Sequence, residues 1–224
     1  MKTTDTQTKQ LIHRRASTFV RDPRGSVMFT LDTIQQGAGT VWHTFFCSLL
    51  AHLWGIQLGS SCKFSGQTHF RKYPGSTIQI GKNCRFRSSF RSKLVGLNRP
   101  CGISTHHKNA EISLGDCCGL SGTIIGAARS IILEDRVLCG ANVTITDFDW
   151  HTMSLSQRNQ GGMEKAQPVR IGENVWLGLN TLVLKGVEIG KNTVVGANSV
   201  VASSLPENVL AAGIPARVIR SIAE

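Results

Sequence analysis

A histidine and two aspartates stand close together in the segment TDFDWHTM, residues 146–153. Asp147 and Asp149 come shortly before His151. A histidine near its ordinary pKa can accept a proton from a hydroxyl or an amine, and a carboxylate can fix the tautomer and orientation of its ring. We therefore interpret these three residues as candidate catalytic groups, with His151 as the general base. The alternative is a surface histidine beside two solvated acids.

The segments around His151 carry an apolar residue at every sixth position. Asn or Gly stands three residues after each of the first five members of this series, and Gly directly follows four members. Neither a helix nor an alternating strand has this period. A six-residue repeat is typical of a solenoid in which each short strand points one side chain inward, with Asn and Gly at the corners. The series is Ile171, Leu177, Val183, Ile189, Val195 and Val201.

The repeat divides the chain into three predicted parts. Residues 56–204 form the solenoid, in triangular coils of about eighteen residues. Residues 92–111 break the phase and are expected to form a bulging connection, and a polar loop excursion, 152–168, directly follows His151. Such interruptions mark loops that often lie on the functional face. Residues 205–224 are a C-terminal tail.

The first 55 residues are predicted to form a basic arm and an amphipathic helix. Over residues 41–54, two apolar rows at four-residue spacing flank a polar side. Two interpretations stay open: the helix caps the first coil, or its Trp-rich face contacts a membrane interface. The helix is too short and too polar on one side to span a bilayer, and the first 20 residues contain no secretory signal peptide.

The composition favours an anionic partner. The 25 Lys and Arg residues outnumber the 14 Asp and Glu, which gives a net charge of +11. A phosphorylated cofactor, an acidic or nucleotide-linked sugar, a membrane surface or nucleic acid would fit, although no aromatic platform or reading motif indicates nucleic acid. The seven cysteines are odd in number and lack a Cys-x-x-Cys pair, so we expect reduced, apolar cysteines in a cytoplasmic protein.

The run IGENVWLGLNTLVLKGVEIGKNTVVGANSVVASSLPENVLAAGIPARVIR resembles the C-terminal half of the hexapeptide-repeat acyltransferases. It is most similar to sugar O-acetyltransferases of the maltose, galactoside, nodulation-factor and polysaccharide-biosynthesis type, and the similarity covers roughly residues 112–222. The resemblance implies a left-handed parallel β-helix, here with an N-terminal amphipathic helix. It also implies a homotrimer with active sites between subunits and acetyl-coenzyme A as the acyl donor, without a metal. His151 matches the base that deprotonates the acceptor hydroxyl for direct attack on the thioester.

The resemblance also implies two sets of binding residues. The tryptophan of the NVWLG motif would lie near the acetyl group, backbone groups of the coils would receive the pantetheine arm, and arginines in PARVIR would bind the 3′-phosphate. The cofactor-binding residues are Trp176, Gly178, Gly196, Ala197, Arg217 and Arg220. The acceptor-binding residues are Ser121, Thr123 and Met163. Ser203 stands where many relatives carry a basic residue, so one phosphate contact would be missing.

The function we expect is acetylation of a sugar hydroxyl in polysaccharide or glycolipid biosynthesis. The acceptor can be lipid-linked, and the protein would be cytoplasmic, either free or peripheral at the inner face of the membrane. An N-acyltransferase for a nucleotide-linked amino sugar and a non-catalytic scaffold are the alternatives. A zinc hydratase would need about three convergent ligands, whereas His106 and His107 are expected to face solvent.

Overall fold

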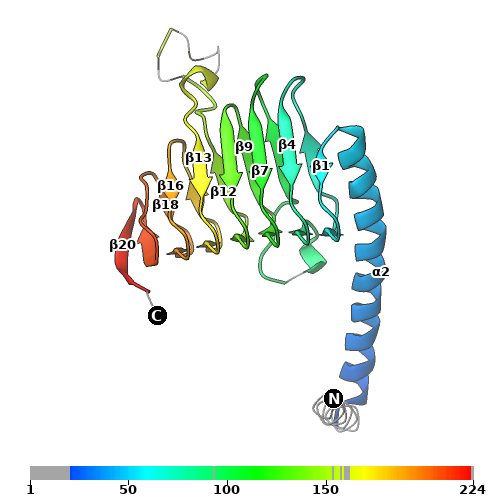
Figure 1. The fold of residues 1–224 in the computed structure, drawn as a ribbon. Helices are drawn as coiled ribbons and strands as arrows, with labels where there is room; N and C mark the ends of the chain where they lie inside the picture. The colour runs from blue at the N-terminus through cyan, green and yellow to red at the C-terminus, as the bar shows by residue number, and fades with distance from the viewer. Residues whose placement is uncertain (1–20, 93, 153, 157, 159–161, 223–224) are drawn as a thin grey trace, which may run out of the picture. The chain divides into compact units, whose positions relative to one another are not determined.

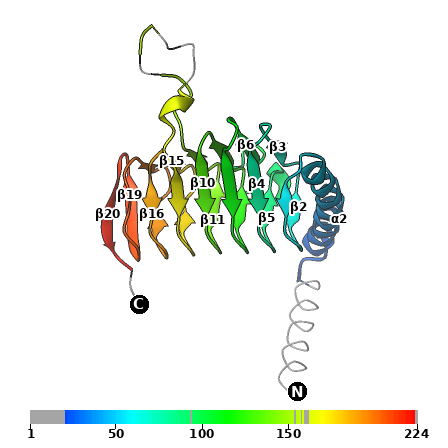
Figure 2. The same cartoon turned by 45° about the horizontal axis from the view of Figure 1, so that its top comes forward.

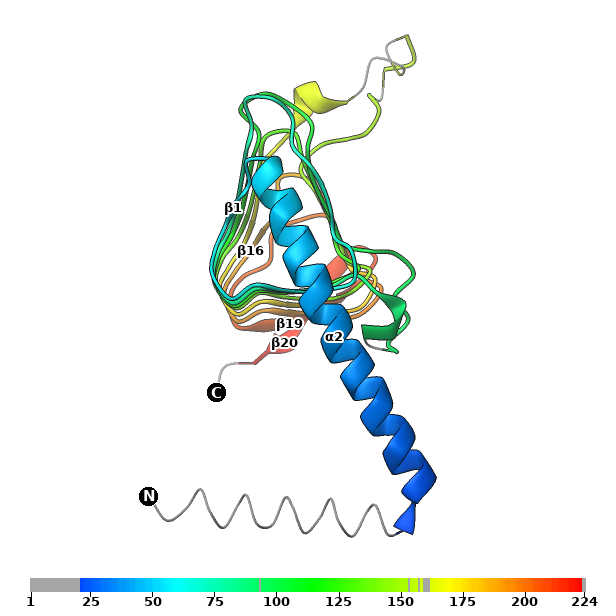
Figure 3. The same cartoon turned by 90° about the vertical axis from the view of Figure 1, so that its right-hand side faces the viewer.

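The computed structural model describes residues 21–222, except 93, 153, 157 and 159–161. The chain forms two compact units, Met1–Gly39 and Thr40–Glu224. The larger unit is a parallel β-helix of triangular cross-section, built from three sheets (Figures 1 and 3). The predicted solenoid is therefore confirmed.

Each coil of the β-helix contributes one strand to each sheet, in the order A, B, C. Sheet A contains β1 (Gln57–Leu58), β4 (Thr77–Ile80), β7 (Glu111–Leu114), β10 (Ser130–Leu133), β13 (Val169–Ile171) and β16 (Glu188–Ile189). Sheet B contains β2 (Lys63–Ser65), β5 (Arg85–Arg87), β8 (Gly119–Ser121), β11 (Leu138–Ala141), β14 (Trp176–Leu177), β17 (Val194–Val195), β19 (Val209–Gly213) and β20 (Ala216–Ser221). Sheet C contains β3 (His69–Arg71), β6 (Gly102–Thr105), β9 (Ile124–Ala127), β12 (Thr144–Thr146), β15 (Leu182–Val183) and β18 (Val200–Val201).

The β-helix is left-handed, as the sequence resemblance implies. Viewed along its axis from the N-terminal end in Figure 3, the chain passes from sheet A to B to C counter-clockwise as the coils recede. Neighbouring strands pair in parallel and close to full register, and only the pair β19–β20 among the described strands is antiparallel. Side chains at one position of the repeat therefore stack from coil to coil.

The six-residue period arises from one buried apolar side chain and one corner in each strand unit. All six members of the predicted series are buried in the core. The corner residues that follow adopt positive φ, from 57° at Asn198 to 74° at Gly186. Because a side chain other than Asn or Asp rarely adopts this conformation, the corners select Asn and Gly. Asn amides also bond between coils, as from Asn180 Nδ2 to Asn198 Oδ1 at 3.0 Å.

The N-terminal helix is longer than the sequence pattern predicts. Helix α2 spans Pro23–Leu53, so residues 23–40, which the pattern assigns to the arm or leaves unassigned, are helical. Its start has two standard signals, because Asp22 accepts a hydrogen bond from the Gly25 N–H at 2.8 Å and proline occupies the first helical position. Gly37 and Gly39 interrupt the apolar pattern, and glycine has a low helix propensity. Hydrophobic periodicity therefore does not predict this part of the helix.

The C-terminal half of α2 packs against the first coil, as the capping interpretation predicts. Cys47 and Ala51 are fully buried. The Thr44 hydroxyl accepts a hydrogen bond from the Phe64 N–H of β2 at 3.0 Å, and the Cys47 sulfur accepts one from the Thr68 N–H at 3.4 Å. None of the described helices combines the length and hydrophobicity needed to span a bilayer.

The first predicted break in the repeat, residues 92–111, is placed too far along the chain. Strand β6, residues 102–105, lies in the middle of this segment, and the loop begins earlier, just after β5, with a short 3-10 helix, η1 (Phe90–Ser92). Arg99 fastens the loop to the corner between sheets B and C: its guanidinium donates to the Asn142 carbonyl at 2.5 Å and to the Gly122 carbonyl at 3.1 Å. The second excursion lies between β12 and β13 and ends with η3 (Met163–Lys165) (Figure 2).

The cysteines are free thiols, as predicted. Six of the seven are buried, and Cys117 is exposed. Burial raises the pKa of Cys139 to about 12, so this thiol stays protonated at neutral pH. The buried cysteines therefore act as small apolar core residues.

Candidate active site

His151 lies at the base of the excursion that leaves the corner between sheets C and A. Its Nδ1 is 3.2 Å from the Arg158 carbonyl oxygen, and the ring is exposed. A carbonyl oxygen can only accept, so this bond selects the tautomer with hydrogen on Nδ1. Nε2 then carries the lone pair, which is the form needed for a general base.

The Asp147 carboxylate is bound to backbone N–H groups. Its side chain is fully buried and accepts hydrogen bonds from the backbone N–H groups of Ala128, Arg129 and Ser130 at 2.7–2.8 Å. Burial raises the pKa of this carboxyl, and the three N–H bonds oppose the rise. Asp147 thus ties the start of the excursion to the turn between β9 and β10.

Asp149 joins the two strands of chain at the base of the 152–168 excursion. Its carboxylate forms an ion pair with Lys185, and its backbone forms a bridge with Gly162. A Cβ on Gly162 would lie 2.2 Å from the Asp149 carbonyl oxygen, so only glycine allows this approach. The carboxylate that the sequence predicts as the orienting partner of His151 is thus bound to Lys185, and a backbone carbonyl contacts the ring instead.

An aromatic cluster that the sequence analysis missed lies beside His151. Trp150 is 55% exposed and packs on Phe148, with ring centroids 4.7 Å apart, and on His106, at 5.0 Å. The prediction that His106 faces solvent is wrong, since it is half-buried, whereas His107 is exposed. Strand register could have found this cluster, because His106 directly follows β6 while Phe148 and Trp150 follow β12, two coils later.

The pKa of His106 lies below its ordinary value, which disfavours the charged ring. Burial lowers it first, and the positive charge of Arg71 lowers it further, while Asp147 acts in the opposite direction. Nε2 of His106 lies 2.9 Å from the Ser104 hydroxyl oxygen. His106 is therefore a neutral ring at pH 7 that supports Trp150.

The residues predicted to bind the cofactor lie on sheet B and its corner with sheet C. Trp176 on β14 is 53% exposed, next to the half-exposed Leu138 of β11. Gly178 and Gly196 occupy the same corner position in successive coils, and a Cβ on Gly178 would lie 2.6 Å from the Ala197 nitrogen. The close stacking of coils alone therefore requires Gly178, whether or not a ligand binds there.

The two predicted phosphate-binding arginines lie on the last strand, β20. Arg217 and Arg220 are exposed, and each donates to a neighbouring backbone carbonyl, of Ala216 at 2.9 Å and of Ser221 at 3.2 Å. Among the described residues, neither arginine is in an ion pair with a carboxylate. Each guanidinium group is therefore accessible to an anion from solvent.

The three predicted acceptor-binding residues lie in different surroundings. Thr123 is fully buried, and its hydroxyl bonds within its own turn, to the backbone of Ser121. Ser121 is only 8% exposed, so neither hydroxyl is placed to meet an acceptor from solvent. Met163 is 39% exposed at the start of η3, on the same excursion as His151.

His151 and the cofactor-binding candidates lie at different corners of one chain. His151 stands between β12 and β13, at the corner between sheets C and A, whereas Gly178, Gly196 and Ala197 directly follow β14 and β17, at the corner between B and C. One side of the triangle separates these corners, which is roughly 15–20 Å for six extended residues. A single small acceptor cannot contact both corners of the same chain.

Two further features of the structure bear on where a ligand could bind. A groove of about 510 Å³ lies on sheet A and is lined by residues such as Gln167, Arg170 and Glu188, without any of the predicted site residues. Within the described part of the chain, no three His, Cys, Asp or Glu side chains converge as metal ligands. The zinc hydratase alternative therefore gains no ligand set from these residues.

Comparison with known proteins identifies the repeat. Residues 168–203 match the family model "Hexapeptide repeat of succinyl-transferase". The galactoside O-acetyltransferase of Lactococcus lactis is 36% identical over 64% of this chain and 63% of its own, and that of Escherichia coli is 42% identical over 42% and 45%. The chain thus spans less than two thirds of the curated relatives that it matches.

Solved structures share the fold at lower identity. AntD, an N-acyltransferase from Bacillus cereus solved with dTDP and coenzyme A, is 19% identical with a TM-score of 0.58 over 78% of this chain and 88% of its own. A hexapeptide-repeat acetyltransferase from Vibrio cholerae solved with acetyl-coenzyme A is 22% identical, with a TM-score of 0.51 over 79% and 76%. These similarities establish the hexapeptide-repeat β-helix.

Proposed function

We propose that this hexapeptide-repeat β-helix is an acetyl-coenzyme A-dependent O-acetyltransferase that acts on a saccharide hydroxyl. The observation that carries the proposal is His151, whose Nδ1 is fixed by the Arg158 carbonyl and whose Nε2 is available as a base. The galactoside O-acetyltransferases among the relatives suggest the acceptor class and the donor. Polysaccharide or glycolipid biosynthesis would be the setting.

The reaction would be a direct transfer. Nε2 of His151 accepts the acceptor's hydroxyl proton while the oxygen attacks the thioester carbonyl carbon. The C–S bond then breaks, and the protonated imidazole returns its proton to the leaving thiolate. The Arg158 carbonyl supports this sequence because it accepts from Nδ1–H in both protonation states of the ring.

Trp150 supports a saccharide as the acceptor. Its half-exposed indole directly precedes His151 and is held by Phe148 and His106. An exposed aromatic face with fixed orientation suits the apolar face of a sugar ring, whose hydroxyls then point sideways toward a base. Met163 would extend this acceptor side of the site.

The distance between corners supports an active site shared between subunits. Trp176, Gly178, Gly196 and Ala197 of one copy would bind the acetyl and pantetheine groups next to His151 of another copy. Arg217 and Arg220 would bind the 3′-phosphate through the planar fork that guanidinium offers to phosphate. A homotrimer satisfies this arrangement with three equivalent sites.

The first test is calorimetric titration of the full chain with acetyl-coenzyme A. We expect saturable binding near one site per chain, at least about tenfold weaker in the double variant Arg217→Ala/Arg220→Ala, because two charged hydrogen-bond donors are lost. Arg136→Ala is the matched control, because Arg136 is an exposed arginine that pairs with Glu173 elsewhere on the β-helix. Absence of binding by a folded protein would favour the scaffold alternative.

The second test compares two histidines. His151→Gln should lower kcat about 10²–10⁴-fold with unchanged coenzyme A binding, whereas His107→Gln, an exposed neighbour of the aromatic cluster, should retain activity. Sugar hydroxyls and a nucleotide-linked amino sugar should be assayed in parallel. Transfer to the amine alone would replace the proposed reaction with N-acylation, and activity unaffected by His151→Gln would refute this base.

A further inference from the structure

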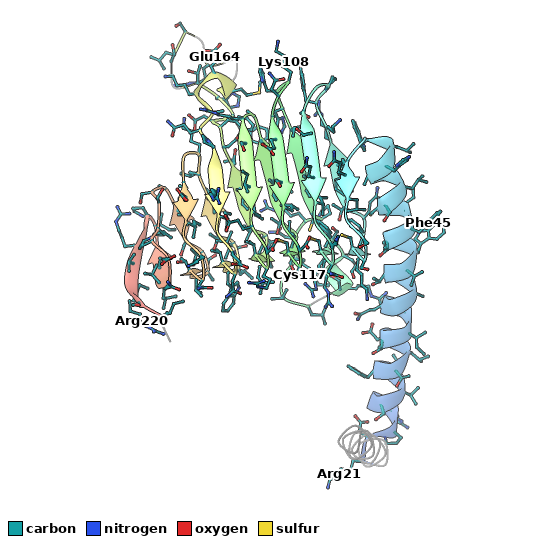
Figure 4. All side chains as sticks on the ribbon, in the orientation of Figure 1. Arg21, Phe45, Lys108, Cys117, Glu164 and Arg220 are labelled. Atoms are coloured by element: carbon teal, nitrogen blue, oxygen red, sulfur yellow. The ribbon has the colours of Figure 1, made fainter. Side chains whose placement is uncertain are left out.

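The half of α2 that caps the β-helix has two different apolar faces. Small residues, among them Cys47 and Ala51, face the first coil and are fully buried. At 3.6 residues per turn, Phe45 and Leu49 lie about 160° around the helix from Cys47, on either side of the opposite face. Phe45 points away from the coils in Figure 4.

The outward face is large, aromatic and uncovered. Trp42 and Phe45 are each 66% exposed and Leu53 is 71% exposed. The remaining exposed apolar residues of this face are Val41, Phe46 and Leu49. An amphipathic helix normally turns its larger side chains toward the core, so the reversed arrangement indicates a binding surface outside the chain.

The charge distribution selects the partner. Residues 33–110 contain ten Lys and Arg and no Asp or Glu, whereas residues 111–224 contain nine Lys and Arg and eleven Asp and Glu. Because coils stack in chain order, the excess positive charge surrounds the end of the β-helix that α2 covers. In the first coil, Lys63 lies on β2 and Arg71 ends β3. The ammonium of Lys72, directly after β3, is near Gly55, just after α2.

Among the residues that the structure describes, these cations have no carboxylate partner. The ion pairs among the described residues join groups at position 134 or later: Arg136–Glu173, Arg170–Glu134, Lys185–Asp149 and Lys191–Glu207. Aromatic side chains on a helix that lies flat, together with unpaired cations around it, match the interface of a bilayer that contains anionic lipids. A second copy of the chain would bring the same positive charge and is disfavoured by repulsion.

We propose that the N-terminal end of the β-helix, residues 41–54 with the cations of the first coils, binds the surface of anionic membranes. The outward face of α2 would enter the headgroup region, and Lys63, Arg71 and Lys72 would contact lipid phosphates. The proposal does not depend on acetyl transfer, and an acetyltransferase held in this way would reach an acceptor attached to lipid.

The test is co-sedimentation of the full chain with vesicles of phosphatidylcholine, with and without 30 mol% phosphatidylglycerol. We expect binding to the anionic vesicles, weak binding to neutral ones, and release at high salt. The double variant Trp42→Ser/Phe45→Ser should bind at least about tenfold less, because two aromatic side chains no longer enter the interface. Ile219→Ser, an exposed apolar residue of β20 at the other end of the β-helix, is the matched control and should bind normally.

A second pair of variants tests the charges. Lys63→Gln/Arg85→Gln alters adjacent, exposed residues on β2 and β5 and should weaken binding about fivefold for each charge, whereas Lys191→Gln should have little effect. Circular dichroism and sedimentation establish that each variant folds and keeps its oligomeric state. Binding that ignores lipid charge or survives Trp42→Ser/Phe45→Ser overturns the proposal. So does a mass change in Trp42→Ser/Phe45→Ser without vesicle binding by the wild type, since another copy would then cover this face.

Discussion

Replacing Asp147 should cost far more stability than replacing Asp149, although the two acids stand two residues apart. Asp147 is fully buried and accepts three backbone N–H bonds, whereas the Asp149 carboxylate is 40% exposed and pairs with Lys185. A hydrogen bond to a charged group contributes about 1.5–3 kcal/mol, and an orphaned buried donor costs about 1–3 kcal/mol. Part of this gain is offset by the desolvation of the carboxylate, the same effect that raises its pKa.

We expect Asp147→Ala to lower the free energy of unfolding by about 3–5 kcal/mol, because the backbone N–H groups of Ala128, Arg129 and Ser130 all lose their acceptor. For a chain of this length, each kcal/mol corresponds to about 2–4 °C in the melting temperature, so the midpoint should fall by about 6–20 °C. Asp147→Asn keeps one acceptor oxygen and should lose less. Asp149→Ala removes a partly exposed ion pair, worth about 1 kcal/mol, and is the control.

Differential scanning calorimetry of the three variants at one protein concentration provides the measurement, because an oligomer melts in a concentration-dependent manner. Activity at a temperature where all variants are folded separates the anchoring role of Asp147 from a direct catalytic one. Equal midpoints for Asp147→Ala and Asp149→Ala would refute the reasoning. A large loss of kcat in a fully stable Asp147→Asn protein would instead support the role assigned to this acid by the sequence alone.

Three further predictions concern groups around the site. Because burial lowers the pKa of His106, its protonation favours the unfolded chain, so stability falls as the pH drops below about 6.5. Urea melts of His106→Gln across this range should show a shallower fall, and an unchanged slope would contradict the shift. Asn180→Ala should cost about 1–2 kcal/mol in chemical unfolding, because its φ is 58° and its amide bonds to Asn198, while Asn180→Gly should recover the backbone part. Arg99→Met should release the loop after β5 and speed thermolysin cleavage near Leu94, whereas cleavage at the wild-type rate would mean that other contacts hold the loop.

The repeat made the β-helix predictable, because one buried residue and one corner recur at a fixed spacing. Ile171 to Val201 and the corner residues Asn174, Asn180 and Gly186 behave as the sequence predicts. Helix α2 was less predictable, because its inner face uses small residues and its larger apolar residues point outward. A pattern that assigns bulky side chains to the core identifies the helix but not the direction of its faces.

The sequence predicted where the candidate site lies along the chain, but not which residues contact one another there. The break in the repeat located His151, but hydrogen-bond partners depend on how the coils stack. Asp147 reaches the turn at residues 128–130 of the preceding coil, a relation that sequence separation does not reveal. The contact of Trp150 with His106 also joins two coils, and finding it requires the register of β6 and β12 in addition to the sequence.

The structure at the two ends of the β-helix limits end-to-end association between copies of the chain. Every coil presents strand edges that the next coil would extend, so an uncovered end is a template for open-ended, fibre-like assembly. At one end, the Thr44 hydroxyl of α2 accepts a hydrogen bond from the Phe64 N–H of β2. At the other end, β20 pairs antiparallel with β19. Since the repeat itself has no natural stopping point, these two elements set the length of the solenoid and keep it a closed particle.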